Sequence, residues 1–295
     1  MHSYPISPTD FEAAAIAAAF FFIFTESEMQ NKVLERTKEL LSRQGITSVG
    51  MIPIEECDII KSYLLPDYAK SAIMISVPYR CSKEKRTDGF SEYAGAYDYH
   101  EMFRILFSSL LPLLEAETGF SFAGFSDHSP INEKIAAAKC GIGIIGRNSL
   151  FIDRTYGSFV FIGTIITDAE CFEKVHEVEG CENCMRCVKA CPGRAICEKG
   201  IDVSKCLSGI SQKKKKTDEE KQILKLHHTV WGCDICQNVC PHNINAKLAP
   251  HPYFSKSYVK NFTFEFLNSL SDEEFNKYPF AYKGRKIVLE NMQFI

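Results

Sequence analysis

The stretch CENCMRCVKACP, residues 181–192, has four cysteines at spacings of two, two and three residues, and a proline follows the last one. This pattern is typical of ferredoxins with [4Fe–4S] clusters, in which three of the thiolates bind one cubane and the fourth binds a different cluster. Zinc is disfavoured, because four-ligand zinc sites usually pair two Cys-x2-Cys units across a longer stretch. The stretch therefore predicts one half of a two-cluster domain.

A second motif, WGCDICQNVCP at residues 231–241, has the same spacing but lacks the first cysteine, where Val230 stands instead. Two cubanes need about eight thiolates, four for each cluster. The two motifs supply seven, so the eighth must come from the segment between them, which holds Cys197 and Cys206. We prefer Cys206, because Cys197 lies where a ferredoxin-like chain leaves the cluster loop.

The crossing of ligands between motifs that is typical of two-cluster ferredoxins predicts the two ligand sets. The first cluster takes Cys181, Cys184, Cys187 and Cys240. The second takes Cys191, Cys233, Cys236 and either Cys206 or Cys197. The remaining cysteines are expected to be free thiols or core residues: Cys57, Cys81, Cys140, Cys171 and the unused one of the pair.

The composition sets broad limits on the function. Nine of the 13 cysteines fall between residues 181 and 240, and cluster thiolates must stay reduced, so we expect a cytoplasmic protein. The 34 basic and 37 acidic residues give a net charge of −3, which excludes a global basic field for nucleic acid. A local run of four lysines at residues 213–216 either contacts phosphate or forms a solvated charged face.

Hydrophobic periodicity predicts an α/β or α+β domain before the cysteine-rich part. Strands are expected at residues 46–52, 72–77, 122–125 and 158–166. Helices are expected at residues 29–44, 54–64, 99–116 and 131–140, with Pro112 kinking or dividing the third. The apolar run at residues 13–24 is too short to cross a membrane and lacks the basic flank of a signal peptide.

These shifts in composition predict four parts. Residues 1–28 are interpreted as a leader or a cloning-derived segment, with a packed helix as the alternative. Residues 29–170 form the catalytic domain, residues 171–250 a ferredoxin-like domain with two clusters, and residues 251–295 a helical tail.

The polar stretch SDHSPINEK, residues 126–134, lies between a predicted strand and a predicted helix, where functional residues often gather. Asp127 or His128 is a candidate proton donor at this junction. In the simpler interpretation, Asp127 or Ser129 only caps the helix. The glycines of CGIGIIG, residues 140–146, would let the backbone approach a bulky ligand, although they do not form a convincing dinucleotide motif.

From about residue 45 onwards the sequence resembles the epoxyqueuosine reductases, cobalamin-dependent enzymes with two [4Fe–4S] clusters that complete queuosine synthesis in tRNA. Besides the cysteine motifs, the stretches that carry the resemblance are YAGAYDYH (93–100), SDHSPINEK (126–134), GIGIIGRNSL (141–150), GSFVFIGTIITD (157–168), GCDICQNVCPHN (232–243) and LSDEEFNKYPFAYKGRK (270–286). Several separate motifs in the right order make the resemblance specific.

The resemblance implies a nitroreductase-like corrinoid-binding domain followed by the ferredoxin-like domain. It makes Asp127 the proton donor to the departing epoxide oxygen and Cys206 the outlying ligand of the second cluster. The positions implied near cobalamin are Asp127, Leu150, Phe151, Ile152, Ser158 and Ser208. Electrons would pass one at a time through the clusters to cobalt. The expected partners are tRNA that carries epoxyqueuosine and an external low-potential electron donor, and the protein is expected to be a monomer without a membrane segment.

The sequence also departs from the family. It is interpreted as a short form, because the helical-repeat domain that usually follows and helps grip tRNA has no counterpart in it. Tyr97 and Thr164 stand where the family tends to have Arg and Glu, and SGISQKKKK (208–216) replaces a Thr-Ile-Glu-like stretch. Two alternatives therefore stay open: a reductase of the same architecture with a substrate other than tRNA, and a non-catalytic protein that transfers electrons or handles corrinoids.

Overall fold

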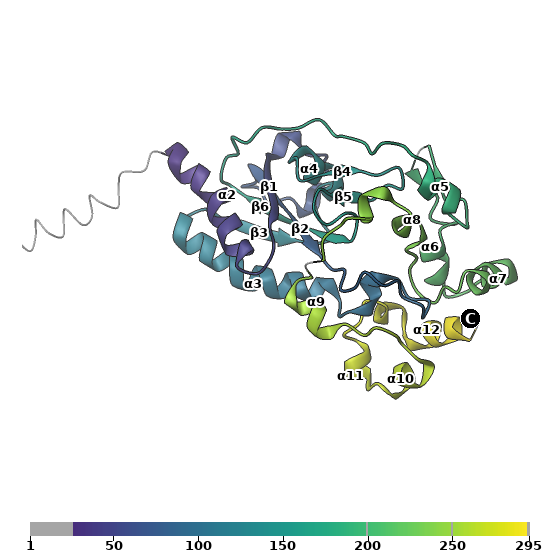
Figure 1. Ribbon diagram of the computed structural model, residues 1–295. Helices are drawn as coiled ribbons and strands as arrows, with labels where there is room; N and C mark the ends of the chain where they lie inside the picture. The colour runs from purple at the N-terminus through teal and green to yellow at the C-terminus, as the bar shows by residue number, and fades with distance from the viewer. Residues whose placement is uncertain (1–25, 199, 249, 294–295) are drawn as a thin grey trace, which may run out of the picture.

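The computed structural model describes residues 26–198, 200–248 and 250–293 (Figure 1). The first helix, α2, spans Glu26–Ser42. The interpretation of residues 1–28 as a leader therefore concerns mainly residues outside the described part of the chain. Within the described residues, no helix combines the length and the hydropathy that crossing a membrane requires.

A four-stranded antiparallel sheet forms the centre of the first half of the chain, with strand order β1-β2-β6-β3. The strands span Ser48–Pro53 (β1), Ser71–Pro78 (β2), Phe122–Phe125 (β3) and Val160–Thr167 (β6). All four were predicted from their apolar runs. Every residue of β2 is buried, because helices cover both faces of the sheet.

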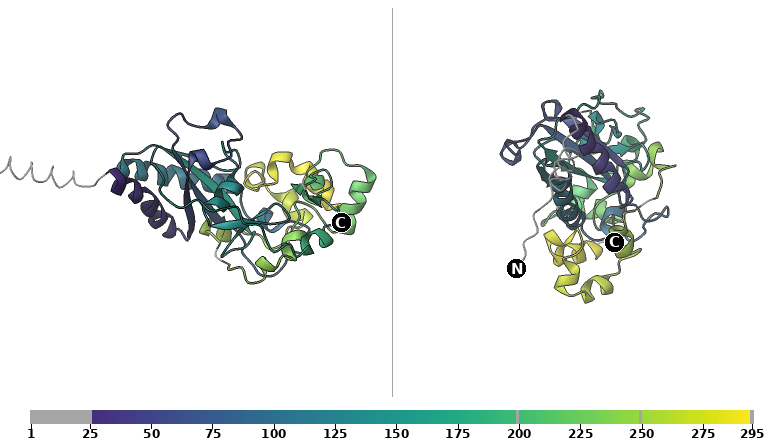
Figure 2. Two further views of the ribbon diagram at one scale, coloured as in Figure 1. Left: turned by 90° about the horizontal axis from the view of Figure 1, so that it is seen from above. Right: turned by 90° about the vertical axis from the view of Figure 1, so that its left-hand side faces the viewer.

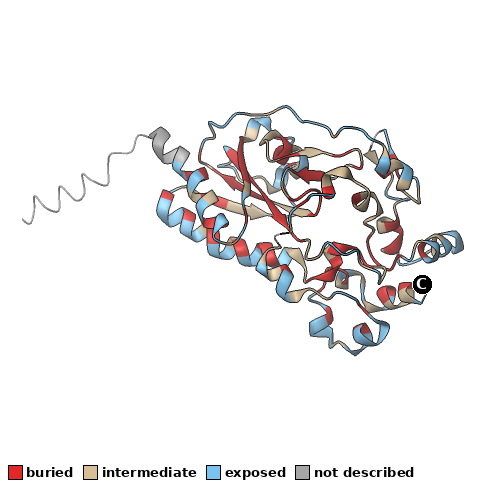
Figure 3. Cartoon of the chain, in the orientation of Figure 1, coloured by how far each residue is buried: buried red, intermediate tan, exposed pale blue. Residues whose placement is uncertain are grey.

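The alternation of side chains along β2 divides the core into two layers. Ile73 and Ile75 pack with α2 and with α3, which spans Tyr99–Thr118. Ala72 and Met74 pack on the opposite face with α4, which spans Glu133–Lys139. Figure 2 shows these elements from two further sides, and Figure 3 shows the buried residues concentrated on the sheet and on the inner faces of the helices.

Two expected helices differ from the structure. Residues 54–64 do not form one helix; they form two short 3-10 turns, Ile54–Glu56 (η1) and Ser62–Leu64 (η2). Between them Ile59 bridges to Ile131, so this segment pairs with the chain beside Asp127 instead of closing a helical turn. The second difference concerns Pro112, which lies inside α3 without dividing it.

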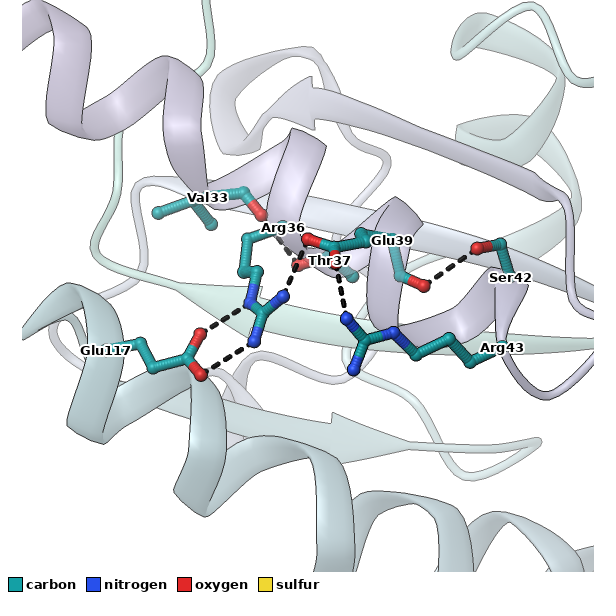
Figure 4. A network of polar contacts seen from close by, with 7 residues as sticks. All are labelled: Val33, Arg36, Thr37, Glu39, Ser42, Arg43 and Glu117. Atoms are coloured by element: carbon teal, nitrogen blue, oxygen red, sulfur yellow. Dashed lines mark hydrogen bonds and ion pairs between the residues drawn. The ribbon is translucent and has the colours of Figure 1, made fainter.

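Salt bridges tie α2 to α3 on the solvent side of this layer (Figure 4). The guanidinium of Arg36 donates to both carboxylate oxygens of Glu117, at 2.5 and 2.7 Å, and to Glu39 at 2.6 Å. Because solvent screens these exposed groups, the pairs contribute little to the stability of the fold. The buried apolar face, which includes Val33 and Leu41, therefore contributes most of the stability of this contact.

The second half of the chain is built from short elements. A hairpin of β4 (Gly143–Ile145) and β5 (Phe151–Asp153), which the sequence did not predict, precedes the cysteine-rich part. That part contains α5 (Arg186–Ala190), β7 (Ile196–Cys197), β8 (Gly200–Ile201), α6 (Leu207–Ser211), α7 (Asp218–Leu226), α8 (Ile235–Asn238) and η4 (Pro241–Asn243). The mixed helix and sheet content confirms the predicted α+β class.

The C-terminal segment packs back onto the body of the molecule. It comprises α9 (Pro252–Ser257), α10 (Phe264–Ser269), α11 (Asp272–Phe275), η5 (Ala281–Lys283) and α12 (Arg285–Met292). Phe262 and Phe280 share an aromatic core with Phe90 and with Trp231, whose indole N–H donates to the Tyr93 hydroxyl at 2.9 Å. This core connects η3 (Glu92–Gly95), ahead of α3, to the second cysteine motif.

Replacing Phe103 tests how α3 is held on the sheet. The ring is 1% exposed and lies over Gly163 of β6, so that a Cβ there would approach the ring to 2.3 Å. We expect Phe103→Ala to lower the free energy of unfolding by about 3–5 kcal/mol, because it leaves a cavity. Ile105→Ala on the same helix, at a residue that is 46% exposed, should have a much smaller effect. Chemical denaturation followed by far-UV circular dichroism compares the two, and equal losses would contradict this packing.

Candidate cluster centres and active site

Four of the cysteines assigned to the first cluster line one pocket: Cys181, Cys184, Cys187 and Cys240. The first two lie in the loop before α5, Cys187 lies in α5, and Cys240 precedes η4. The loop bends sharply because Asn183 and Met185 adopt left-handed backbone conformations, with φ of 52° and 62°. The fold thus brings the fourth cysteine of the second motif to the first motif.

The other group contains Cys191, Cys206, Cys233 and Cys236. Cys191 and Cys206 lie close enough to the Cys236 thiol to raise its pKa electrostatically, and Cys206 and Cys236 do the same for Cys233. Cys206 sits directly before α6. In contrast, Cys197 is exposed in β7 and its thiol donates to the Gly200 carbonyl at 3.3 Å. The structure therefore places Cys206, and not Cys197, with this group.

Burial raises the pKa of Cys233 to about 12 and that of Cys236 to about 11. Such thiols stay protonated at neutral pH unless a cationic partner draws off the proton, as iron does on binding. Among the described residues, no three His, Cys, Asp or Glu side chains converge closely enough for a single metal ion. A cubane binds each thiolate through a different iron atom, so its ligands stand farther apart, and two all-cysteine sets fit that chemistry.

Asp127 lies in the loop after β3, with φ of 62° and a side chain that is 71% exposed. Its Oδ2 is 3.7 Å from Nε2 of His100, in the first turn of α3. The other ring nitrogen of His100 contacts Asp98 Oδ1 at 2.7 Å, and Asp98 also caps α3. A carboxylate, an imidazole and a second carboxylate thus form a chain that ends at an accessible oxygen.

The charges decide where a proton resides in this chain. The His100 imidazole has the largest effect and lowers the pKa of Asp127, partial burial opposes it, and the Tyr99 hydroxyl lowers the pKa further. Conversely, Asp127 and then Asp98 raise the pKa of His100 to about 9. At neutral pH the carboxyl of Asp127 is therefore ionised, and the proton lies on the imidazole.

The helix-capping interpretation of Asp127 and Ser129 is wrong. The residue at the N-cap of α4 is Asn132, and no side chain caps this helix. Ser129 accepts a hydrogen bond from the Ile131 N–H at 3.4 Å instead. The other candidate proton donor, His128, contacts the Lys61 ammonium through Nδ1 at 3.1 Å and belongs to the edge of the site.

Glu133 lies in the polar stretch at residues 126–134, but the sequence did not predict that it belongs to the Asp127 site. Its carboxylate accepts the Thr164 hydroxyl at 2.9 Å. This hydroxyl and the Asp127 backbone both lower the pKa of Glu133, against the larger effect of burial. Burial raises its pKa to about 7. The signal available in the sequence was indirect: Thr164 stands where the family tends to have Glu, and the residue that it contacts is another glutamate.

The positions implied near cobalamin differ in accessibility. Phe151, Ile152 and Ser158 are buried, whereas Leu150 and Ser208 are partly exposed. The Ser158 hydroxyl donates to Gln237 Oε1 at 2.8 Å and accepts from Asn243 Nδ2 at 2.9 Å, so it links the sheet to the second cysteine motif. Ser208 lies in α6, two residues after Cys206, and partial exposure leaves it open to a ligand.

Titration of His100 tests the proton chain. We expect its pKa to lie near 9 and to fall towards about 6.5 in Asp127→Asn, because the main cause of the shift is removed. Since the folded-state pKa is raised, the pair stabilises the protein fully below about pH 6.5 and loses this contribution as the pH rises through about 9. Two-dimensional NMR of the imidazole follows the titration, with Glu173→Gln as the control. An unchanged His100 pKa in Asp127→Asn would contradict the contact.

Comparison with known proteins supports this arrangement. Residues 180–243 match the family model described as a 4Fe-4S double cluster binding domain. The chain is 32% identical to the epoxyqueuosine reductase of Leadbetterella byssophila over 231 residues, which cover 77% of this chain and 74% of the relative. For that of Cyclobacterium marinum the identity is also 32%, over 70% of this chain and 71% of the relative.

Other relatives are covered less completely. The epoxyqueuosine reductase of Cellulophaga algicola is 34% identical over 65% of this chain, and the match spans 64% of the relative. Among solved structures, that of epoxyqueuosine reductase from Streptococcus thermophilus superposes with a TM-score of 0.74 at 24% identity, covering 89% of this chain and 80% of the other. This similarity shows the fold. The two relatives that are matched over more than two thirds of their length, at 32% identity, show the family. The chain belongs to the epoxyqueuosine reductase family.

Proposed function

We propose that this protein is a cobalamin-dependent reductase that uses two [4Fe–4S] clusters to reduce epoxyqueuosine to queuosine in tRNA. The observation that carries the proposal is the division of eight cysteines into two groups of four in a chain of this family. The sheet with α2, α3 and α4 is the nitroreductase-like, corrinoid-binding part. Eight thiols that must remain reduced favour the cytoplasm.

Cys181, Cys184, Cys187 and Cys240 would hold the first cluster, and Cys191, Cys206, Cys233 and Cys236 the second. When bound, the clusters supply single electrons and cobalamin supplies the reducing cobalt centre. Leu150 and Ser208 are the most accessible of the residues proposed to contact the corrinoid. Because Ser208 shares α6 with the residues next to Cys206, the second cluster is the one nearer the corrinoid.

The chain's own contribution to the reaction is the proton. The departing oxygen of the epoxide must be protonated, and Asp127 is the accessible end of the chain from Asp98 through His100. His100 holds the proton at neutral pH and passes it through the Asp127 carboxylate to that oxygen. Glu133, which accepts the Thr164 hydroxyl, lies beside Asp127.

An external low-potential donor would approach the cysteines that would hold the first cluster, where Cys184 is exposed. The cysteines of the second group are all partly covered. Arg186, Lys189 and Arg194 are exposed and lie within ten residues of Cys184 along the chain, in a protein of net charge −3; exposed Glu182 lines the pocket itself. The local positive charge suits an acidic electron-transfer protein, whose approach it would accelerate at low salt.

The tRNA substrate is supported by a related structure, an epoxyqueuosine reductase in complex with an epoxyqueuosine-modified tRNA-Tyr stem loop, which superposes with a TM-score of 0.75 at 22% identity. A reductase that acts on a different substrate is the second candidate. It is favoured by the lysine run, in which Lys213 pairs with Glu220 and the Lys216 ammonium donates to the Lys213 carbonyl at 2.7 Å. These two lysines are thus engaged within the protein. The third candidate, a non-catalytic electron carrier, does not need Asp127. A monomer suffices for all three.

Iron content tests the ligand sets. Fully reconstituted protein should hold about eight iron atoms, four in each cluster. We expect Cys206→Ser to hold about four, because the second cluster loses a ligand, and Cys197→Ser to keep about eight. Iron and sulfide assays on anaerobically prepared protein give the counts. The reverse result would move the outlying ligand to Cys197, and zinc in place of iron would overturn the proposal.

Turnover tests the proposed reaction. With cobalamin and a low-potential reductant, the reconstituted protein should deoxygenate epoxyqueuosine in tRNA. Asp127→Asn should lower the rate about 10²–10⁴-fold, because an amide keeps the shape but cannot relay the proton from His100 to the departing oxygen. Asp67→Asn, at a carboxylate outside the site, is the control. Mass spectrometry of digested tRNA reports the product. Cobalamin binding without tRNA turnover would favour the second candidate, and full function of Asp127→Asn the third.

A further inference from the structure

A short segment between β1 and β2 pairs with the loop that follows β3. Ile59 forms an antiparallel backbone bridge with Ile131. The N–H groups of Ile60 and Lys61 both donate to the Pro130 carbonyl, at 2.8 and 3.0 Å. The segment is therefore fixed by backbone hydrogen bonds to the loop that carries the proposed proton donor.

Although its backbone is fixed, this segment exposes large apolar side chains. Ile59 is 41% exposed, Ile60 is 58% exposed and Tyr63 is 75% exposed. Single exposed apolar residues are common on protein surfaces, but three within five residues form a patch of the kind that marks an interaction site. We call residues 59–63 the rim segment, because they border the Asp127 site.

The rim segment also brings a cation and an aromatic ring to the edge of this site. Nζ of Lys61 is 3.1 Å from Nδ1 of His128, the residue after Asp127. The ring centroids of Tyr63 and His128 lie 6.4 Å apart, with an angle of 54° between the planes. The η2 turn holds the Tyr63 backbone, since the Leu64 N–H donates to the Lys61 carbonyl at 3.0 Å. Both groups are thus anchored through their backbone beside the Asp127 loop.

We propose that the rim segment binds the single-stranded RNA next to the modified nucleotide, with Tyr63 stacking on a neighbouring base and Lys61 contacting a phosphate. The inference rests on the function proposed above. The modified nucleotide remains joined to its neighbours when its epoxide reaches Asp127, so the strand must run across the surface around this residue. Single-stranded RNA is typically recognised by the stacking of its bases on aromatic side chains.

The rim segment has the two kinds of group that single-stranded RNA requires. The exposed tyrosine ring can receive the flat face of any base, and Ile60 adds an apolar contact. The Lys61 ammonium complements the charge of a phosphate. Lys213 and Lys216 are engaged within the protein, so the rim segment supplies a cation for RNA that these two lysines do not. A protein partner docked on the same surface would instead obstruct access to Asp127.

Binding of a labelled RNA stem loop tests the contact with a base. The full chain with both clusters and cobalamin, without a reductant, is titrated against a fluorescent tRNA-Tyr stem loop that carries epoxyqueuosine, and anisotropy gives the Kd. We expect Tyr63→Ala to raise the Kd about 5–150-fold, the usual effect of losing one base–aromatic stack. Tyr63→Phe keeps the ring and should stay within about twofold of wild type. Phe172→Ala, at an exposed ring in the chain after β6, is the control and should leave the Kd unchanged.

The salt dependence of the same binding separates the phosphate contact from the stacking contact. Lys61→Gln should reduce the slope of log Kd against log salt concentration by about 0.7, because one phosphate contact with a single strand is lost. Tyr63→Ala should keep the wild-type slope, because stacking releases no counterion. Lys38→Gln is the matched control: this lysine lies on α2, which packs on the face of the sheet opposite to α4, and its loss should not change the slope.

The outcomes distinguish this inference from the function on which it rests. A wild-type protein that binds no stem loop would overturn the tRNA function itself. Wild-type binding with an unchanged Kd in Tyr63→Ala and an unchanged slope in Lys61→Gln would overturn the inference and leave that function standing. An equal loss of affinity of Tyr63→Ala for an RNA duplex without a loop would also overturn it, because paired bases cannot stack on the ring.

Discussion

A buried hydrogen-bond network of Ser158, Gln237 and Asn243 joins the second cysteine motif to the chain that leads into β6. The Ser158 N–H donates to Asn243 Oδ1 at 2.8 Å, its hydroxyl donates to Gln237, and the Asn243 amide donates both to that hydroxyl and to the Gln237 carbonyl. Gln237 follows Cys236 directly, and Cys240 lies between the two amide residues. This network thus fixes the backbone beside Cys236 and Cys240, one cysteine from each of the two groups. Since all three residues are buried, leaving one group unpaired would cost about 1–3 kcal/mol.

Helix α4 connects the loop of Asp127 to the loop between β4 and β5. Glu133 and Lys134 are neighbours at the start of α4. Glu133 lies beside Asp127, which acts on its pKa, and the Lys134 ammonium donates to the Ser149 carbonyl in the loop between β4 and β5 at 2.7 Å. One short helix, packed on β2 through Ala136 and Ala137, therefore sets both the Asp127 loop and the loop beside the clusters.

Periodic apolar patterns predicted the sheet and the helices that cover it, because burial dictates side-chain polarity there. Along α2 the helical spacing of five residues matches their burial: Val33, Leu34, Thr37, Leu40 and Leu41. The helix predicted at residues 54–64 was wrong because the apolar residues there are not on a buried helical face. Ile59 forms a backbone bridge with Ile131, and the side chains of Ile59 and Ile60 are exposed. The hairpin of β4 and β5 was missed because its strands have only three residues each, and β4 begins with Gly143 and is followed by Gly146.

Sequence patterns also predicted one part of the candidate site and missed another. Cysteine spacing predicted both groups, since a cubane imposes its geometry on local sequence. Spacing cannot reveal the partners of a functional group when they come from distant segments. His100 of α3 and Glu133 of α4 lie beside Asp127, and Thr164 of β6 contacts Glu133, an arrangement that only the fold brings together.

Thr164 shows what such distant partners change. A glutamate at this position, as the family tends to have, would face the Glu133 carboxylate, and two adjacent carboxylates would have to share a proton. Threonine instead donates its hydroxyl to Glu133 at 2.9 Å, which favours the ionised form and opposes the effect of burial. Glu133, beside the proposed proton donor Asp127, is thus a single carboxylate that accepts a hydroxyl hydrogen bond. In this chain a hydrogen bond stands where the family tends to place a charge.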